Sequence, residues 1–176
     1  QQTLDVAHYE KLPVVVTLQA QYNLLDRQID IEILEVCRRY GIPLLPWSPL
    51  GRGWLTGKYR RDHDPANGGH QEKNALRFID SFEKRNVDRT YAILEAVKVV
   101  ADEQDAAMAQ VSLAWLSQHP QIASVILGAR NLTQLRDNLA SSAVTLTDDQ
   151  WADLELVSRP KLPDYPYGFM DIMGGR

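Results

Sequence analysis

Residues 122–138 have the composition and spacing of an anion-binding site. A short apolar run, Ser124–Leu127, ends at Gly128, and a helix is expected to begin at Asn131. The first N–H groups of a helix have no partner within it, and the aligned peptide dipoles leave partial positive charge there, which favours a phosphate. Gly128 allows a ligand to approach the backbone, and the guanidinium of Arg130 can bind phosphate through two hydrogen bonds. The pattern predicts a phosphate site, with an ordinary capped helix after a buried strand as the alternative.

The helix that follows begins with a capping signal. Asn131 is a good N-cap residue, and Gln134, three residues later, is where a capping-box partner would lie. Gln134 and Asn138 are four residues apart, so both should project from one face of this helix.

A second stretch, residues 42–59, also combines a strand with a glycine-containing loop. Pro43–Trp47 is expected to be a short buried strand, because proline at its ends cannot join a hydrogen-bond ladder. The segment Ser48–Gly53 must then form a loop, since it holds two glycines and a proline. An exposed ring face of Trp47 at the end of the strand could stack on a flat heteroaromatic group.

Three segments of the sequence, in this order along the chain, together resemble one enzyme family. LQAQYNLLDR, WSPLGRGWLTGKY and VILGARNLTQLRDN are similar to motifs in the C-terminal half of the aldo-keto reductases, which are NADPH-dependent enzymes built on a TIM barrel. The resemblance extends over nearly the whole chain. It implies that the enzyme reduces an aldehyde or a ketone to an alcohol with NADPH.

The resemblance also assigns roles at the cofactor. Gln19 would hydrogen-bond the nicotinamide carboxamide, and Trp47, where many members have tyrosine, would pack against the nicotinamide ring. Because a guanidinium binds phosphate with charge-assisted hydrogen bonds, Arg130 favours the 2′-phosphate of NADPH over NADH. The expected cofactor-binding residues are Gln19, Trp47, Ser48, Pro49, Leu50, Gly51, Arg52, Lys58, Gly128, Arg130, Gln134, Asp137 and Asn138. A solvated surface lysine is the alternative for Lys58.

The expected fold class is α/β, because strands and helices alternate. The β-branched run Pro13–Leu18 predicts a parallel strand, Ile29–Tyr40 an amphipathic helix that ends at Gly41, and Pro43–Trp47 the next strand. A complete (β/α)8 barrel takes about 250 residues, whereas this chain has 176. We therefore expect a partial TIM (β/α)8 barrel: its C-terminal half, with about three parallel strands plus helices, in a single domain of residues 1–176 that begins as if truncated.

Other segments provide helices, a long loop and a tail. One helix is expected over Val87–Ala101. A second should begin after Asp105, a plausible cap, and run to Gln118, with Trp115 in the core. A third should follow a capping box at Thr147–Gln150. Residues 60–81 predict a long loop, in which His63 and His70 are solvent-exposed and Arg77 cannot be aligned firmly. In the family, the C-terminal tail covers the mouth of the barrel; here residues 160–176 could do so through Tyr165, Tyr167, Phe169 and Met170, or could be a frayed terminus.

Composition excludes several classes of protein. A formal net charge of −4 with scattered basic residues argues against nucleic-acid binding. There is no apolar run of the roughly 20 residues that cross a bilayer and no signal-peptide pattern, which argues against a membrane protein. The single Cys37, expected to be a buried structural thiol, forms no internal disulfide and fits a reducing cytoplasm. No zinc-ligand spacing occurs, so no metal is expected.

Catalytic residues are not assigned to this chain. In the family, a tyrosine protonates the carbonyl, with a lysine, an aspartate and a histidine beside it, and all four come from the first half of the barrel, which no stretch here matches. The chain alone is therefore expected to be inactive and to need its missing N-terminal half and a small carbonyl substrate. The alternatives are a non-catalytic nucleotide-binding or regulatory module derived from this fold, and a small stand-alone α/β domain. Because three strands cannot close a barrel, self-association through the open edges is also an open alternative.

Overall fold

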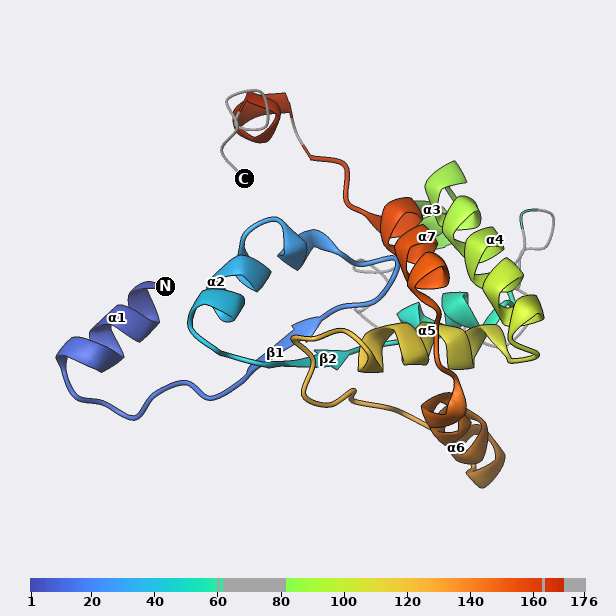
Figure 1. The fold of residues 1–176 in the computed structure, drawn as a ribbon, viewed down its shortest axis with the longest axis horizontal. Coiled ribbons are helices and arrows are strands. Elements are labelled where there is room, and N and C mark those ends of the chain that lie inside the picture. Colours follow the sequence, from blue (N-terminus) through green and yellow to red (C-terminus); the bar gives the residue numbers. More distant parts are fainter. Residues whose placement is uncertain (60, 62–81, 163, 170–176) are drawn as a thin grey trace.

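The protein is an α/β chain with a small parallel sheet and many helices (Figure 1). The computed structural model describes residues 1–59, 61, 82–162 and 164–169. In chain order, the elements are α1 (Gln2–Tyr9), β1 (Leu18–Gln21), η1 (Gln28–Asp30), α2 (Ile33–Arg39), β2 (Leu44–Trp47), η2 (Gly51–Thr56), α3 (Phe82–Arg85), α4 (Asp88–Glu103), α5 (Met108–Ser117), α6 (Leu132–Leu139), η5 (Ala140–Ala143), α7 (Asp148–Ser158) and η6 (Asp164–Gly168).

The sheet pairs β1 with β2 in parallel. Leu18 lies opposite Leu44 and Gln21 opposite Trp47. The segment after α5 continues this arrangement, because Ile122 forms a parallel bridge with Leu44 and the N–H of Ile126 donates to the carbonyl of Pro46 at 3.0 Å. The α/β class with parallel strands is therefore confirmed, with the third predicted strand present only as a run bonded along β2.

Two strand boundaries predicted from sequence were wrong. The strand expected over Pro13–Leu18 is instead Leu18–Gln21, and Val14, Val15 and Val16 are 70%, 40% and 70% exposed. The run Ser124–Leu127 is extended but is not a strand. A strand depends on ladder partners as well as on β-branched side chains, and no described residue pairs with the valines.

The helix predicted over Ile29–Tyr40 is divided. A 3₁₀ turn, η1, comes first and α2 follows, so the apolar stripe is interrupted: Cys37 is buried as expected, but Ile33 and Tyr40 are exposed. Gly41 ends the helix with φ of +64°, the left-handed conformation that its lack of a side chain permits.

The main core lies between α4, α5 and α7, which pack together on the right of Figure 1. Trp115 is fully buried there, as predicted, with Val97 and Leu154. The capping box at Thr147–Gln150 is also confirmed, because each side chain accepts a hydrogen bond from the other residue's backbone N–H. Asp105 does not cap α5; it lies in the preceding turn, and Ala107 occupies the N-cap position.

The two ends of the chain extend away from this core (Figure 1). At the N-terminus, α1 and the segment after it carry exposed apolar side chains, among them Tyr9, Leu12 and the three valines. In the tail, Tyr167 donates a hydrogen bond to Glu32, whereas Tyr165 and Phe169 are exposed. The expectations for His63, His70, Arg77 and Met170 fall outside the described residues. Within the described ranges, no helix is long and apolar enough to cross a bilayer.

Candidate nucleotide-binding site

One face of the sheet carries the first expected site residues. Because side chains alternate along a strand, Gln19 and Gln21 on β1 share a face with Leu45 and Trp47 on β2. Leu44 and Pro46 point to the opposite face and are fully buried. Gln19 is exposed and the Trp47 side chain is 39% exposed, so an amide and an indole ring are accessible on the same face.

The chain turns sharply directly after Trp47. Ser48 has φ of +56°, a left-handed backbone conformation that residues other than glycine rarely adopt. Its carbonyl accepts a hydrogen bond from the N–H of Gly51 at 3.0 Å. Gly51 has φ of +53°, and a Cβ at this position would lie 3.3 Å from Cδ1 of Leu25. Pro49 and Gly51 are buried and Arg52 is exposed, so the loop has a fixed inner side and an accessible outer side.

A buried turn that sequence reasoning missed holds this corner. Asn23 is fully buried, and its Nδ2 donates to the carbonyl of Ser48 and to Oδ2 of Asp26, each at 2.9 Å. The same Asp26 oxygen accepts hydrogen bonds from Gln21 at 2.9 Å and from Arg85 at 2.8 Å. An asparagine that bonds backbone N–H groups just after it is a recognised turn signal, so the turn itself could have been predicted.

The two glycine-containing stretches each carry a cation, Lys58 in one and Arg130 in the other, and the charge of Arg130 acts on Lys58. Burial and the positive charge of Arg130 together hold the pKa of Lys58 below its usual value. The Lys58 ammonium also lies 5.0 Å from the centre of the Tyr59 ring and folds back over Gly53. A pair of neighbouring cations is a place that an anion would stabilise.

The start of α6 lies next to these cations. Asn131 is the N-cap, as predicted: its Oδ1 accepts from the N–H of Gln134 at 2.8 Å. The Gln134 side chain accepts from the N–H of Arg130 at 3.0 Å and not from the N-cap residue, which differs from the expected capping box. No described atom would lie within 4 Å of a Cβ at Gly128, so the backbone there is open to a ligand.

Further along α6, the expected site residues differ in exposure. Gln134 and Asp137 are exposed, whereas the Asn138 side chain is buried. The Asp137 carbonyl accepts from Nε2 of Gln110 at 3.0 Å, which fixes α6 against α5.

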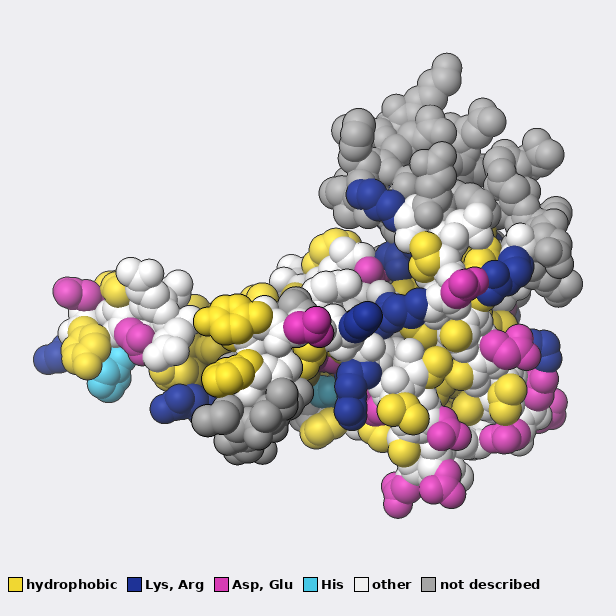
Figure 2. Space-filling view, turned by 90° about the horizontal axis from the view of Figure 1, so that it is seen from above, with side chains coloured by type: hydrophobic (Ala, Val, Ile, Leu, Met, Phe, Trp, Pro, Cys, Tyr) yellow, Lys and Arg dark blue, Asp and Glu magenta, His cyan; other side chains and the backbone are white. Residues whose placement is uncertain are grey.

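Basic side chains gather on one face of the molecule. Figure 2 shows Lys and Arg side chains in the middle of the view and acidic ones along its lower right edge. Among the residues with described positions, no group of His, Cys, Asp and Glu could hold a metal ion. The basic side chains on this face could bind an anion.

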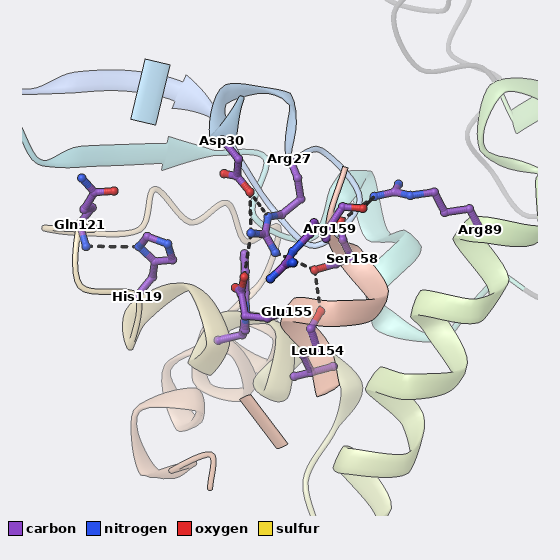
Figure 3. Close-up of polar contacts among 10 residues, drawn as sticks. Arg27, Asp30, Arg89, His119, Gln121, Leu154, Glu155, Ser158 and Arg159 are labelled. Atoms are coloured by element: carbon purple, nitrogen blue, oxygen red, sulfur yellow. Dashed lines mark hydrogen bonds and ion pairs between the residues drawn. The ribbon is translucent and has the colours of Figure 1, made fainter. Parts of the chain in front are cut away.

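A second charged cluster is buried and serves a different purpose (Figure 3). Arg27 is 5% exposed and donates to Asp30 at 2.6 Å, to Glu155 at 2.9 Å and to the Ser158 hydroxyl at 2.7 Å. Its guanidinium also lies 5.0 Å from the centre of the Trp115 ring. Because these partners use the charged group fully, the cluster joins the turn after β1 to α7 and offers no reactive side chain.

The aldo/keto reductase family model matches residues 2–159. The chain is 34% identical over 154 residues to Protein tas of Escherichia coli (strain K12), a match that covers 88% of this chain and 43% of that protein. It is 34% identical over 149 residues to a probable voltage-gated potassium channel subunit beta of Oryza sativa subsp. japonica, covering 81% and 44%. It is 30% identical over 144 residues to the NADH-specific methylglyoxal reductase of Escherichia coli (strain K12), covering 82% and 41%.

These matches establish the family: the chain belongs to the aldo/keto reductases, as its motifs predicted. It spans less than half the length of the curated relatives that it matches.

Proposed function

We propose that this chain supplies most of the cofactor site of an NADPH-dependent reductase of aldehydes or ketones. The observation that carries the proposal is the N-terminus of α6, where Arg130 immediately precedes the capped first turn and the backbone at Gly128 is open, so that positive charge and the helix N-terminus favour a phosphate. A nucleotide cofactor with a pyrophosphate and a 2′-phosphate fits this concentration of positive charge. Bound there, it would supply a hydride to the carbonyl carbon of the substrate.

Each expected residue has a role in this proposal. At the nicotinamide, Gln19 bonds the carboxamide and the accessible ring of Trp47 stacks. The loop of Ser48, Pro49, Leu50, Gly51 and Arg52, together with Lys58, follows the pyrophosphate. Gly128, Arg130, Gln134, Asp137 and Asn138 surround the adenosine end, with the buried Asn138 acting through the position of α6.

Arg130 determines the choice between the two nicotinamide cofactors in this proposal. Its guanidinium would bind the 2′-phosphate that NADPH has and NADH lacks. One relative is named an NADH-specific reductase, so cofactor choice varies among proteins similar to this one. We therefore treat the preference for NADPH as the part of the proposal that most needs measurement.

The proton donor and the rest of the barrel are proposed to lie outside this chain. Residues 1–176 are proposed to form one C-terminal portion of a barrel, with residues 160–176 as its C-terminal tail. The exposed side chains of Leu12, Val14, Val15 and Val16 provide an apolar surface for an N-terminal half to cover. The substrate is a small carbonyl compound, and the chain alone does not turn it over.

Titration of the chain with NADPH and with NADH, followed by tryptophan fluorescence, tests this function. Trp47 is the most accessible of the four tryptophans, so a stacked nicotinamide should quench its emission. We expect Arg130→Ala to weaken NADPH binding by about tenfold or more, as loss of a charge-assisted contact predicts, and to leave NADH binding nearly unchanged. The matched control is Arg136→Ala, which removes the same charge from an exposed position on α6.

Equal weakening of both cofactors by Arg130→Ala would contradict the role given to the 2′-phosphate. Absence of quenching in the wild-type chain would contradict a preformed cofactor site. Carbonyl-dependent oxidation of NADPH by the chain alone would contradict the placement of the catalytic groups elsewhere.

A second candidate is a regulatory subunit that binds nucleotide without turnover. Similarity to proteins named as probable potassium channel beta subunits favours it. Assay of this chain together with an N-terminal barrel half separates the two functions, because only the reductase would consume NADPH with a carbonyl compound.

A further inference from the structure

The side chain of Asn23 is completely engaged in hydrogen bonds. Its Oδ1 accepts from the N–H of Leu25 at 2.8 Å and from the N–H of Asp26 at 3.0 Å, and its Nδ2 donates to Asp26 and to the Ser48 carbonyl. Three of these four bonds lie within the turn that follows β1. The fourth reaches 25 residues along the chain, to the corner after β2.

The corner that receives this bond needs an external partner. Ser48 has φ of +56°, which costs conformational free energy for a residue with a Cβ. The Ser48 carbonyl also accepts from the N–H of Gly51, so its orientation sets the path of the loop. A buried donor on a rigid turn can hold that carbonyl in place, because leaving the donor unpaired would be unfavourable.

Asn23 is in turn fixed from two further elements. Oδ2 of Asp26 accepts from Nδ2 of Asn23, from Gln21 at the end of β1 and from the buried Arg85 of α3. The ion pair between Arg85 and Asp26 measures 2.8 Å, and both side chains are largely buried. The orientation of the Asn23 amide is therefore determined by its surroundings.

We propose that Asn23 is a positioning residue that holds the Ser48 corner in the shape needed to bind the cofactor pyrophosphate. This inference rests on the proposed function, since it assumes that residues 48–52 contact the cofactor. Asn23 itself touches no cofactor atom. Asn23 acts through the Ser48 carbonyl. Asp26, itself paired with Arg85, holds the Asn23 amide in the required orientation.

The informative substitution is Asn23→Asp. The carboxylate keeps an acceptor for the N–H groups of Leu25 and Asp26, but it has no donor for the Ser48 carbonyl or for Oδ2 of Asp26, and its second oxygen faces both of these acceptors. We expect NADPH to bind at least about tenfold more weakly, because two hydrogen bonds are lost and two carboxylates are brought together. Asn23→Ser is the second variant: a hydroxyl can still bond the nearby backbone but is too short to reach Ser48.

Ser48→Gly provides the readout that a merely structural role would not affect. Glycine adopts positive φ without strain, so the corner should keep its shape without the clamp. In the Ser48→Gly background, Asn23→Asp should therefore weaken NADPH binding less than it does in the wild-type background. Equal weakening in both backgrounds, or wild-type affinity in folded Asn23→Asp and Asn23→Ser, would overturn the inference.

Hydrogen exchange separates this inference from the proposed function. Without any cofactor, the amide of Gly51 should exchange faster in Asn23→Asp than in the wild type, because its acceptor is the Ser48 carbonyl. Faster exchange in a chain that binds no NADPH would support the clamp and refute the proposed function. Unchanged exchange would refute the clamp whatever the chain binds.

Discussion

Replacing Arg27 with methionine tests the account of how the turn after β1 is joined to α7. The side chain is similar in length but carries no charge, so Asp30 and Glu155 would remain as carboxylates without their cation, and the Ser158 hydroxyl would lose its donor. Removing one partner of a buried ion pair costs about 3–5 kcal/mol, because the remaining charge stays poorly solvated.

The loss of stability caused by Arg27→Met should lie at the lower end of that range. The side chains of Asp30 and Glu155 keep 15% and 23% of their exposure, so water can solvate them in part. We expect the free energy of unfolding to fall by about 3 kcal/mol. Glu155→Gln should cost about 1–3 kcal/mol, because its single amide oxygen can accept from Nε1 of Trp115 or from Arg27 but not from both, and the amide NH2 then faces the other donor.

Urea unfolding followed by tryptophan fluorescence measures both changes. With a slope of about 1–3 kcal/mol/M, a loss of about 3 kcal/mol lowers the midpoint by roughly 1–3 M. The control is Arg38→Met, which removes the exposed ion pair with Glu35 and should leave the midpoint unchanged. If Arg27→Met cost less than about 1 kcal/mol with an unchanged slope, the network would not join the two segments as described.

Three further predictions concern polar side chains in the core: Tyr22, Ser158 and His119. Burial raises the pKa of Tyr22, whose hydroxyl has no hydrogen-bond partner among the described residues. Tyr22→Phe should therefore raise stability by about 1 kcal/mol at pH 7, because it removes a buried hydroxyl without a partner, and above about pH 10 it should keep stability that the wild type loses as its unfolded state ionises. Ser158→Ala, which removes a bonded buried hydroxyl, should cost about 1–3 kcal/mol in the same urea experiment. Burial lowers the pKa of His119, so the folded state favours the neutral ring. Stability should therefore fall as the pH decreases below about 6.5, because the unfolded state then binds a proton more readily than the folded state. The loss is about 1.4 kcal/mol for each pH unit by which the folded-state pKa lies below the unfolded one. His119→Gln should flatten that dependence and the exposed His8→Gln should not; an identical pH profile for wild type and His119→Gln would refute it.

Features that depend on near neighbours in the sequence could be predicted. The capping box at Thr147 involves residues three apart, and the burial of Trp115 follows from helical periodicity. The strand at Val14–Val16 was wrong because a strand needs partners elsewhere, and periodicity contains no information about them.

The candidate site likewise has features that the sequence predicted and features that it did not. Motifs indicated the two stretches that hold Lys58 and Arg130, and burial together with the charge of Arg130 keeps the pKa of Lys58 below its usual value. Asn23 was expected only as part of a polar cluster after the first strand, and its bond to Ser48, like the bond of Arg27 to Ser158, was not foreseen because the partners lie 25 and 131 residues away. A buried arginine has no sequence pattern of its own, and its pairing becomes visible only in the folded chain.

The bond between Arg27 and Ser158 also has a consequence for biosynthesis. The two residues are 131 positions apart, so a ribosome that adds about 5–20 residues per second needs roughly 7–26 s to make the second after the first. During this interval the Arg27 guanidinium and the ring of Tyr22 have no α7 to pack with, and Trp115 joins them only after residue 115 has been made. Closure of the core therefore follows the synthesis of α7, and chaperones that bind nascent apolar segments would meet this protein with its core still open.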